Sequence, residues 1–475
     1  MTINVLSLPL KRLAVVAVAA STLGGCATFS ADGGFGSVER TTAERTGKEV
    51  KWARTDADRA VIDKRVTELL GNPLSADDAV QIALLSNRGL QASFFELGIS
   101  EADLVQAGRL PNPGFAMLRA RRGDDYKIEQ ALTINIFALV TLPLARQVEQ
   151  RRFEQSQRQV AMDVLQLAAE TRKAYYIAVA ADESVRYMRQ VRTIADASAE
   201  LARRMARAGN WNRLQQAREQ GFYADAALNV ARTHEAQVAA RERLTRLLGL
   251  WGSQARFKLP ERLSELPQDP DELPNVEQTA MEQRLDLQAA RLETEALARN
   301  LGLTKATRFI NVLEFGLARV LEGLRSDPYK SGYEISFELP LFDWGTARVA
   351  KAEAIYMQAV NRAAETAVNA RSEVREAYRT SRLRYDVARH YRDEIVPIRK
   401  RIADENQLRY NGMLIGVFEL LADARAQIDS VNGYIDALRD FWIAKTDLDM
   451  ALIGKPGFSA PPKTPMAGGN IATGH

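Results

Sequence analysis

Few side chains in this sequence are placed to carry chemistry, and the single cysteine is the clearest candidate. Cys26 follows a basic start, an apolar run at residues 13–20 and two glycines. This order is typical of a secretory signal, and the apolar run is too short to span a bilayer. We therefore expect residues 1–25 to be a signal peptide and Cys26, in the lipobox-like sequence Leu-Gly-Gly-Cys, to be lipidated. An ordinary signal peptide followed by an incidental cysteine is the alternative.

The other reactive residue types form no catalytic or metal-binding pattern. The three histidines, His234, His390 and His475, are far apart in the sequence. Acidic residues are plentiful, but in long helical segments they are ordinary solvated residues. The net charge is +4, with basic and acidic residues interleaved, so nucleic acid is not favoured as a partner. We expect a protein that is not an enzyme and that needs no metal or cofactor.

Two long helical segments dominate the sequence, and they must hold any functional side chains in place. Residues 144–208 contain neither Pro nor Gly, and an unbroken helix of roughly 64 residues spans on the order of 95 Å. The second segment runs from residue 346 to about 410, and its only proline, Pro397, should kink or interrupt it. In the first segment, apolar and small residues recur at alternating steps of four and three: Val160, Val164, Leu167, Thr171, Ala174, Ala178, Ala181, Val185 and Met188. This heptad pattern predicts coiled-coil packing.

A β-hairpin is predicted before each long helix. The first hairpin combines strands at 115–121 and 126–142 and ends at Pro143, and the second spans about 309–339 and ends at Pro340. Apolar and polar residues alternate in the second strand of each hairpin, at 126–142 and at 333–339. A sheet with one apolar and one polar face suits a barrel wall between lipid and a wet lumen. It equally suits a sheet that is half-buried in a soluble domain.

Further helices are predicted from Ser75, a plausible N-cap, to about Arg109, and at about 213–248, 276–306 and 417–453. Landmarks recur in one order at an offset of about 200 residues, for example Leu-Pro-Leu at 142–144 and at 339–341. This recurrence predicts an internal two-fold repeat. We assign 74–275 to the first repeat and 276–454 to the second. An extended, lipid-anchored segment at 26–73 should precede them, and a disordered tail at 455–475 should follow.

Four strands per chain cannot close a barrel, and open sheet edges in lipid leave backbone groups unpaired. If the strands face lipid, several copies must each contribute four, and three copies give twelve. The predicted fold is therefore mainly α with a small β part. A long coiled-coil α-helical barrel is joined to four strands per protomer, and a homotrimer closes a 12-stranded transmembrane β-barrel.

Over roughly residues 74–454 the chain resembles the TolC-like outer-membrane factors, in particular their lipid-anchored branch. Three sequences carry the resemblance: Leu-Pro-Leu-Phe-Asp-Trp-Gly at 339–345, Leu-Pro-Asn-Pro at 110–113, and Tyr-Asn-Gly at 410–412 leading to Leu-Leu-Ala-Asp-Ala-Arg at 420–425. The matching strand-to-helix junctions are at Pro143 and at Pro340, Asp343 and Gly345. Arg146 stands in the first junction where Asp343 stands in the second.

The resemblance implies a passive exit duct of a tripartite efflux pump for drugs or metal ions, in the outer membrane of a Gram-negative bacterium. It implies a homotrimer that reaches through the periplasm to an adaptor protein and an inner-membrane pump. Gly209 and Gly412 would then lie at helical tips that contact the adaptor. Glu419 and Asp423 would be candidate gate residues, although a solvated helix face is an equal alternative. A duct for type I protein secretion and a periplasmic coiled-coil scaffold without a pore are the other functions considered.

Overall fold

The computed structural model describes residues 28–270, 272–309 and 312–456. Cys26 and most of the predicted tail lie outside these residues. The chain forms two compact units. Of the described residues, unit 1 contains those up to 168, 245–258 and 277–372, and unit 2 contains 169–244, 259–276 and those from 373 to 456.

Helices dominate both units, and one sheet lies in unit 1. The helices are α2 (Phe35–Thr46), α3 (Asp56–Leu69), α4 (Ala76–Ser86), α5 (Arg88–Ala107), α6 (Ile136–Arg207), α7 (Arg213–Leu248), α8 (Val276–Gln283), α9 (Leu285–Ala306), α10 (Thr346–His390), α11 (Val396–Asn411) and α12 (Val417–Ile453). The strands are β1 (Gly114–Arg122), β2 (Asp125–Asn135), β3 (Leu313–Leu324) and β4 (Lys330–Phe337). Among the described residues, no helix combines the length and the apolar character needed to cross a bilayer.

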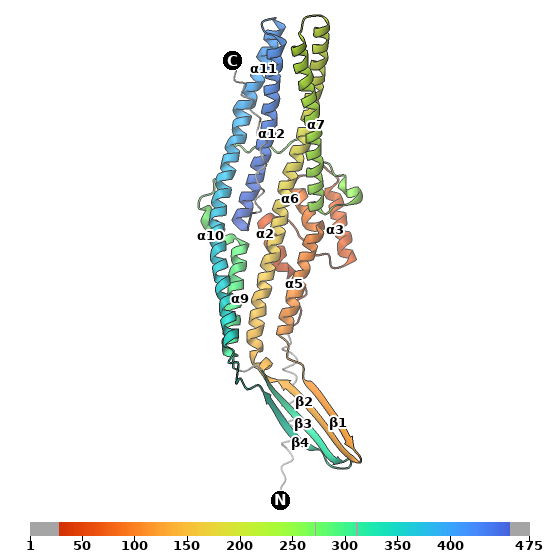
Figure 1. Ribbon diagram of the computed structural model, residues 1–475, viewed down its shortest axis with the longest axis vertical. Coiled ribbons are helices and arrows are strands. Elements are labelled where there is room, and N and C mark those ends of the chain that lie inside the picture. The colour runs from red at the N-terminus through yellow and green to blue at the C-terminus, as the bar shows by residue number, and fades with distance from the viewer. Residues whose placement is uncertain (1–27, 271, 310–311, 457–475) are drawn as a thin grey trace. The chain divides into compact units, whose positions relative to one another are not determined.

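The sheet of unit 1 is antiparallel, with the strand order β1-β2-β3-β4 (Figure 1). The two predicted hairpins, β1-β2 and β3-β4, are joined through β2 and β3, where Leu132 is opposite Leu317. Leu132 is also opposite Phe115, and Leu317 is opposite Tyr333. Hairpins that are far apart in the sequence therefore share one sheet and one register.

The N-terminal part of unit 1 differs from the extended segment that the sequence predicts. It contains α2 and α3, and Thr55 starts α3 with a capping box that it forms with Asp58. Phe35 of α2 packs edge-on against Phe94 of α5, with ring centroids 5.0 Å apart. Apolar burial at Val38 and Val66 stabilises both helices on the rest of unit 1. The weak periodicity of the segment concealed them, because few positions on each helix are buried.

The predicted helix from Ser75 to Arg109 is divided at Asn87. Ser75 caps α4 as expected, and the side chain of Asn87 caps α5 by accepting the N–H of Leu90 at 3.0 Å. The Asn87 amide also donates to the carbonyl of Leu247 at 2.9 Å, at the end of α7. Next to it, Gly249 has φ +67, and a Cβ there would lie 2.6 Å from the Ser86 carbonyl oxygen. The break is thus fixed by a contact that is distant in sequence.

Unit 2 contains a packed core between helices. Val191 and Ala195 of α6 are buried with Ala226 of α7, and Phe222 and Ile428 pack against them. Along α6, which passes through both units, six of the nine residues of the predicted heptad seam are buried: Val160, Val164, Thr171, Ala174, Ala178 and Val185. Leu167, Ala181 and Met188 of the same seam are only partly buried. Small residues in the seam let neighbouring helices approach closely.

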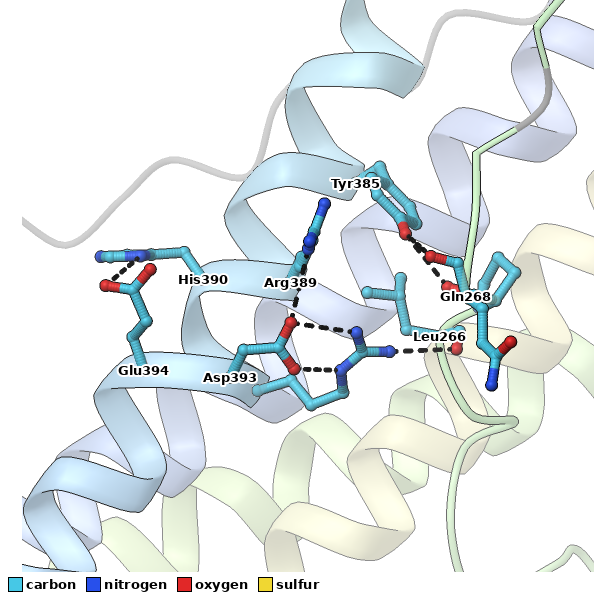
Figure 2. A network of polar contacts seen from close by, with 9 residues as sticks. Leu266, Gln268, Tyr385, Arg389, His390, Asp393 and Glu394 are labelled. Atoms are coloured by element: carbon cyan, nitrogen blue, oxygen red, sulfur yellow. Dashed lines mark hydrogen bonds and ion pairs between the residues drawn. The ribbon is translucent and has the colours of Figure 1, made fainter.

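The linker between α7 and α8 is attached to the helices of unit 2 through its backbone carbonyls. Tyr385 donates its hydroxyl to the Pro267 carbonyl at 3.2 Å and also to Gln268, and Arg392 donates to the Leu266 carbonyl at 3.3 Å (Figure 2). Trp442 donates its indole N–H to the Ser264 carbonyl at 3.0 Å. Linker carbonyls that would otherwise need water are therefore satisfied by side chains of α10, α12 and the turn between α10 and α11.

The second long helix is interrupted just before Pro397, as its sequence predicts. A π-helical turn, Tyr391–Ile395, separates α10 from α11, and the Val396 N–H bonds to the Tyr391 carbonyl. Pro397 follows at the second position of α11, where its missing N–H is tolerated. Arg392 in this turn pairs with Asp393 at 2.7 Å (Figure 2), and this hydrogen bond lowers the pKa of the Asp393 carboxyl.

Candidate functional site

One face of the sheet of unit 1 is apolar in the half that leads into the helices, whereas Gln130, Arg319 and Ser331 lie on the same face toward the hairpin turns. Cross-strand neighbours share a face, so the register aligns apolar side chains in rows across the strands. One row contains Phe115, Leu132, Leu317 and Tyr333, and the next contains Ile134, Phe315 and Ile335. Tyr333 is 73% exposed and Phe115 is 68% exposed, so this face is uncovered in a single chain.

The opposite face of the sheet carries mostly small and polar residues, with Leu118 and Val320 beside Glu129. Its rows contain Thr133, Gly316 and Glu334, then Ala131, Ala318 and Gly332. Lys127 and Glu129 on β2 form an ion pair of 2.9 Å on this face. The sheet therefore separates an apolar side from a water-compatible side.

Within the described part of the chain, the sheet has two open edges. β1 pairs only with β2, and β4 pairs only with β3. Each edge strand therefore presents a row of backbone donors and acceptors to a further strand. Toward the hairpin turns, the guanidinium of Arg319 lies 5.1 Å from the ring centroid of Tyr329, and that of Arg121 lies 5.2 Å from Tyr126. Apolar rows are thus bounded at this end by aromatic and basic side chains.

The second strand-to-helix junction lies between β4 and α10. Asp343 accepts the N–H of Gly345 at 2.8 Å, and Gly345 has φ +70. A Cβ at Gly345 would lie 2.6 Å from the carbonyl oxygen of Arg308, the same oxygen that accepts a hydrogen bond from Arg348. Phe342, almost fully exposed, and Trp344 project from this junction. Pro340, Asp343 and Gly345 all lie in the segment between β4 and α10, where Asp343 and Gly345 form a local turn.

The first junction is built differently, and the prediction that β2 extends to Leu142 and breaks at Pro143 is wrong. β2 ends at Asn135 and α6 begins at the next residue, so Pro143 lies inside the helix. The reason is a cap: the side chain of Asn135 accepts the N–H of Ala138 at 2.8 Å. A helix that is capped at Asn135 includes the apolar residues that the alternating pattern assigned to a strand.

Gly209 and Gly412 lie in the two loops at the helical tips of unit 2. Gly209 has φ +78 between α6 and α7, and a Cβ there would have open space. Asn212 then caps α7 in a reciprocal pair with Gln215, at 2.9 Å in both directions. At the second tip the left-handed residue is Met413, with φ 58, rather than Gly412. Met413 is 94% exposed, which the sequence motif gave no reason to expect.

Glu419 and Asp423 lie one turn apart on α12. Glu419 is exposed in the first turn of the helix, where an acidic side chain is favoured by the helix dipole. Asp423 is half-buried and accepts a hydrogen bond from the Asn406 amide of α11. The two carboxylates therefore differ, since Glu419 is exposed and Asp423 is half-buried and hydrogen-bonded.

No protein-family model matches this sequence, and neither does any curated protein sequence. Solved structures do match. A membrane protein from Pseudomonas aeruginosa is 20% identical, with a TM-score of 0.69 over 79% of this chain and 92% of that one. The CmeC outer membrane channel of Campylobacter jejuni is 16% identical, with a TM-score of 0.64 over 82% and 85%. The open state of the MtrE outer membrane channel of Neisseria gonorrhoeae is 17% identical, with a TM-score of 0.64 over 79% and 88%. The chain has the TolC-like fold.

In this TolC-like fold the expected site residues fall in three places. Pro340, Asp343 and Gly345 form the second junction, Gly209 and Gly412 lie in the tip loops, and Glu419 and Asp423 lie on α12. Pro143 belongs to α6 instead of a junction. Cys26 lies outside the described residues.

Sequence reasoning missed the buried polar contacts of unit 2. Glu219 of α7 is 1% exposed, and its oxygens accept from Arg425 of α12 at 3.0 Å and from Ser198 of α6 at 2.7 Å. The Arg425 guanidinium also lies 4.1 Å from the ring centroid of Phe222. From the sequence, charged residues on these helices are expected to face solvent. No short-range pattern indicates that α12 approaches α7 here.

A second buried pair joins Lys173 of α6 to Asp447 of α12 at 2.8 Å. Burial raises the pKa of the Asp447 carboxyl, although the hydrogen bond from Lys173 opposes this shift. Both pairs link the first long helix or its return helix to α12 within unit 2. Replacing one partner by a neutral residue would leave an uncompensated buried charge. Each pair should therefore fix how its helices pack.

Proposed function

We propose that this protein is the outer-membrane channel component of a tripartite efflux system, a passive exit duct for drugs or metal ions. The observation that carries the proposal is the sheet of unit 1, which has an exposed apolar face, a polar face and two open edges. A water-soluble scaffold would expose neither such a face nor such edges without protection. The likeness of the fold to outer membrane channels supports the same assignment.

The open edges support a duct that forms between copies. β4 of one protomer would pair with β1 of the next, and three protomers would close twelve strands into a transmembrane barrel. The apolar rows would then face lipid and the small, polar rows would face the lumen. Aromatic residues at both ends of the sheet, such as Tyr329 and Trp344, suit the two membrane interfaces.

The helical tips would contact a periplasmic adaptor protein, which in turn binds an inner-membrane pump. Exposed apolar residues at the second tip, Met413 and Leu414, suit helix-to-helix docking. Glu419 of three copies would form an acidic ring that favours cations. Lipidation of Cys26 would add a second attachment to the outer membrane.

Deletion of the gene, followed by complementation, tests this function. We expect the deletion strain to become sensitive to drugs or to metal ions and to retain a fluorescent efflux substrate in the cell. Wild-type protein should reverse both effects, and Glu419→Lys should reverse them poorly for cationic cargo. Unchanged resistance together with loss of a protein from the culture medium would instead assign the duct to type I secretion.

A further inference from the structure

A groove in unit 1 lies where α5 ends and α6 begins. Its volume is about 680 Å³, which is within the range of about 300–1,000 Å³ for ligand cavities. Mostly apolar side chains line it, including Phe29, Val105, Leu110, Pro111 and Leu142. Small residues of α6, Ala138 and Ala145, leave the space open. Gln106, Arg109, Asn112 and Thr141 complete the lining, so the wall combines polar and apolar surface, and the apolar part is the part suited to a hydrocarbon.

The start of the described chain is fixed beside this groove. Ser30 donates its backbone N–H and its hydroxyl to Glu101 Oε1, at 2.6 and 2.5 Å. Glu101 belongs to α5 and is only 6% exposed, so this carboxylate is buried and pairs with Ser30. Phe29, the residue before Ser30, lies in the groove wall. The first described residues of the chain are therefore placed at the groove.

The length of the preceding chain limits where Cys26 can be. Ser30 follows Cys26 by four residues, and four extended residues reach at most about 14 Å. Any group attached to the Cys26 thiol must therefore start within this distance of the Ser30–Glu101 contact. Phe29, which lies between Cys26 and Ser30 in the sequence, lines the groove.

The position of the groove also matches that of a lipid anchor. β1 begins two residues after Asn112 of the groove wall, and β2 ends three residues before Ala138. The groove thus lies at the helical end of the sheet whose apolar face is exposed. Phe29 and Leu110 are about half-exposed at its rim, so a chain could pass from the groove to a surrounding lipid layer.

We propose that this groove binds an acyl chain carried by Cys26 of the same protein. The inference rests on the lipid anchor included in the proposed function. The apolar walls would hold the hydrocarbon between α5 and α6, and Glu101 would position it by fixing Ser30. One acyl chain gives only marginal membrane binding, so a groove that orders the anchor would set its depth relative to the sheet.

Photo-crosslinking tests the proposal. Cells that produce the full-length protein would be fed a palmitate analogue with a diazirine in its chain and an alkyne at its end, and then irradiated. We expect intramolecular cross-links from the Cys26 peptide to residues 102–112 and 138–145. Mass analysis of the N-terminal peptide reports acylation separately. An unmodified peptide would overturn both the anchor and the groove, whereas acylation without these cross-links would overturn the groove alone.

Variants that fill the groove sharpen the result. Ala138→Trp and Ala145→Trp should each lower cross-linking of the acyl chain to the groove at least about fivefold, because a filled groove has no room for an acyl chain. Val140→Trp is the matched control, since Val140 is on the same helix, is 71% exposed and does not line the groove. Glu101→Ala should spread the cross-links to neighbouring surfaces. Equal labelling of the groove in all three tryptophan variants, or labelling of the wild-type groove by an added diazirine phospholipid, would contradict the proposal.

Discussion

The two strand-to-helix junctions of unit 1 occupy equivalent places in the order of elements but are built differently. At the first, β2 ends at Asn135 and α6 begins at once. At the second, the eight residues 338–345 separate β4 from α10. Leu-Pro-Leu follows both strands in the sequence, at 142–144 and 339–341, yet the first copy lies inside α6 and the second copy is not helical. The helix start is therefore decided by local hydrogen bonds rather than by the shared sequence.

Each junction has one residue that fixes its geometry. Asn135 supplies a side-chain cap that lets the helix begin early. Gly345 supplies a left-handed backbone that only a residue without Cβ can adopt beside the Arg308 carbonyl. The comparison predicts that substitutions at the two junctions differ in size and even in sign.

Gly345→Ala should have the largest effect. Left-handed backbone at a residue other than glycine costs about 1–2 kcal/mol, and the clash with the Arg308 carbonyl should raise the loss of unfolding free energy above about 3 kcal/mol. Gly123→Ala is the matched control, because Gly123 has φ +60 and a Cβ added there would have no atom within 4 Å. Chemical denaturation measures both. Equal losses would mean that the close approach to Arg308 contributes nothing.

The two prolines should respond in opposite directions. Pro143→Ala restores a backbone N–H inside α6 and should stabilise the protein by up to about 3 kcal/mol. Pro340→Ala frees the backbone of a non-helical segment and should destabilise the protein by less than about 1 kcal/mol. Thermal unfolding followed by circular dichroism compares them. A loss of stability for Pro143→Ala would contradict the placement of this residue inside a helix.

Asn135→Ala should remove the cap of α6. The expected loss is about 1 kcal/mol, with faster hydrogen exchange over the first turns of the helix. Asn135→Ser keeps a capping oxygen and should recover most of the loss. If the serine variant behaves like the alanine variant, the cap does not determine where α6 starts.

The smallest effect concerns the π-helical turn that distinguishes the second long helix from the first. The pKa of the Asp393 carboxyl is lower in the folded protein than its ordinary value of 3.8. The charged carboxylate therefore stabilises the fold above pH 3.8, and this stabilisation is lost as the pH falls through the lowered pKa. Asp393→Asn should therefore lower the melting temperature slightly at pH 5, and this difference from wild type should shrink at pH 3. A difference that does not depend on pH would exclude the Arg392–Asp393 pair as its cause.

Patterns within one helix were sufficient to predict much of this fold. The ends of α7 and α12, the heptad seam and the interruption before Pro397 all follow from Gly, Pro and apolar spacing. The failures have a common physical cause, which is competition from hydrogen bonds that the spacing does not show. Asn135 moved the start of α6, and Asn87 divided a helix by binding the end of α7. Gly, Pro and Asn in the sequence indicated the loops that contain Gly209, Gly412 and Gly345, whereas the buried Glu219–Arg425 pair was not predicted, because it joins residues 206 positions apart.

Disulfide cross-linking between sheet edges tests the central claim, that the duct exists only between copies. Ala116 of β1 would be replaced by Cys together with Lys330, Gly332, Glu334 or Ser336 of β4, one pair per variant. Within one sheet, β1 and β4 are three strand spacings apart, about 14 Å, which is too far for a disulfide. We predict covalent dimers and trimers, with no larger species, for at least one pair in oxidised membranes, and their loss on reduction. Monomers alone in all four variants would contradict the account.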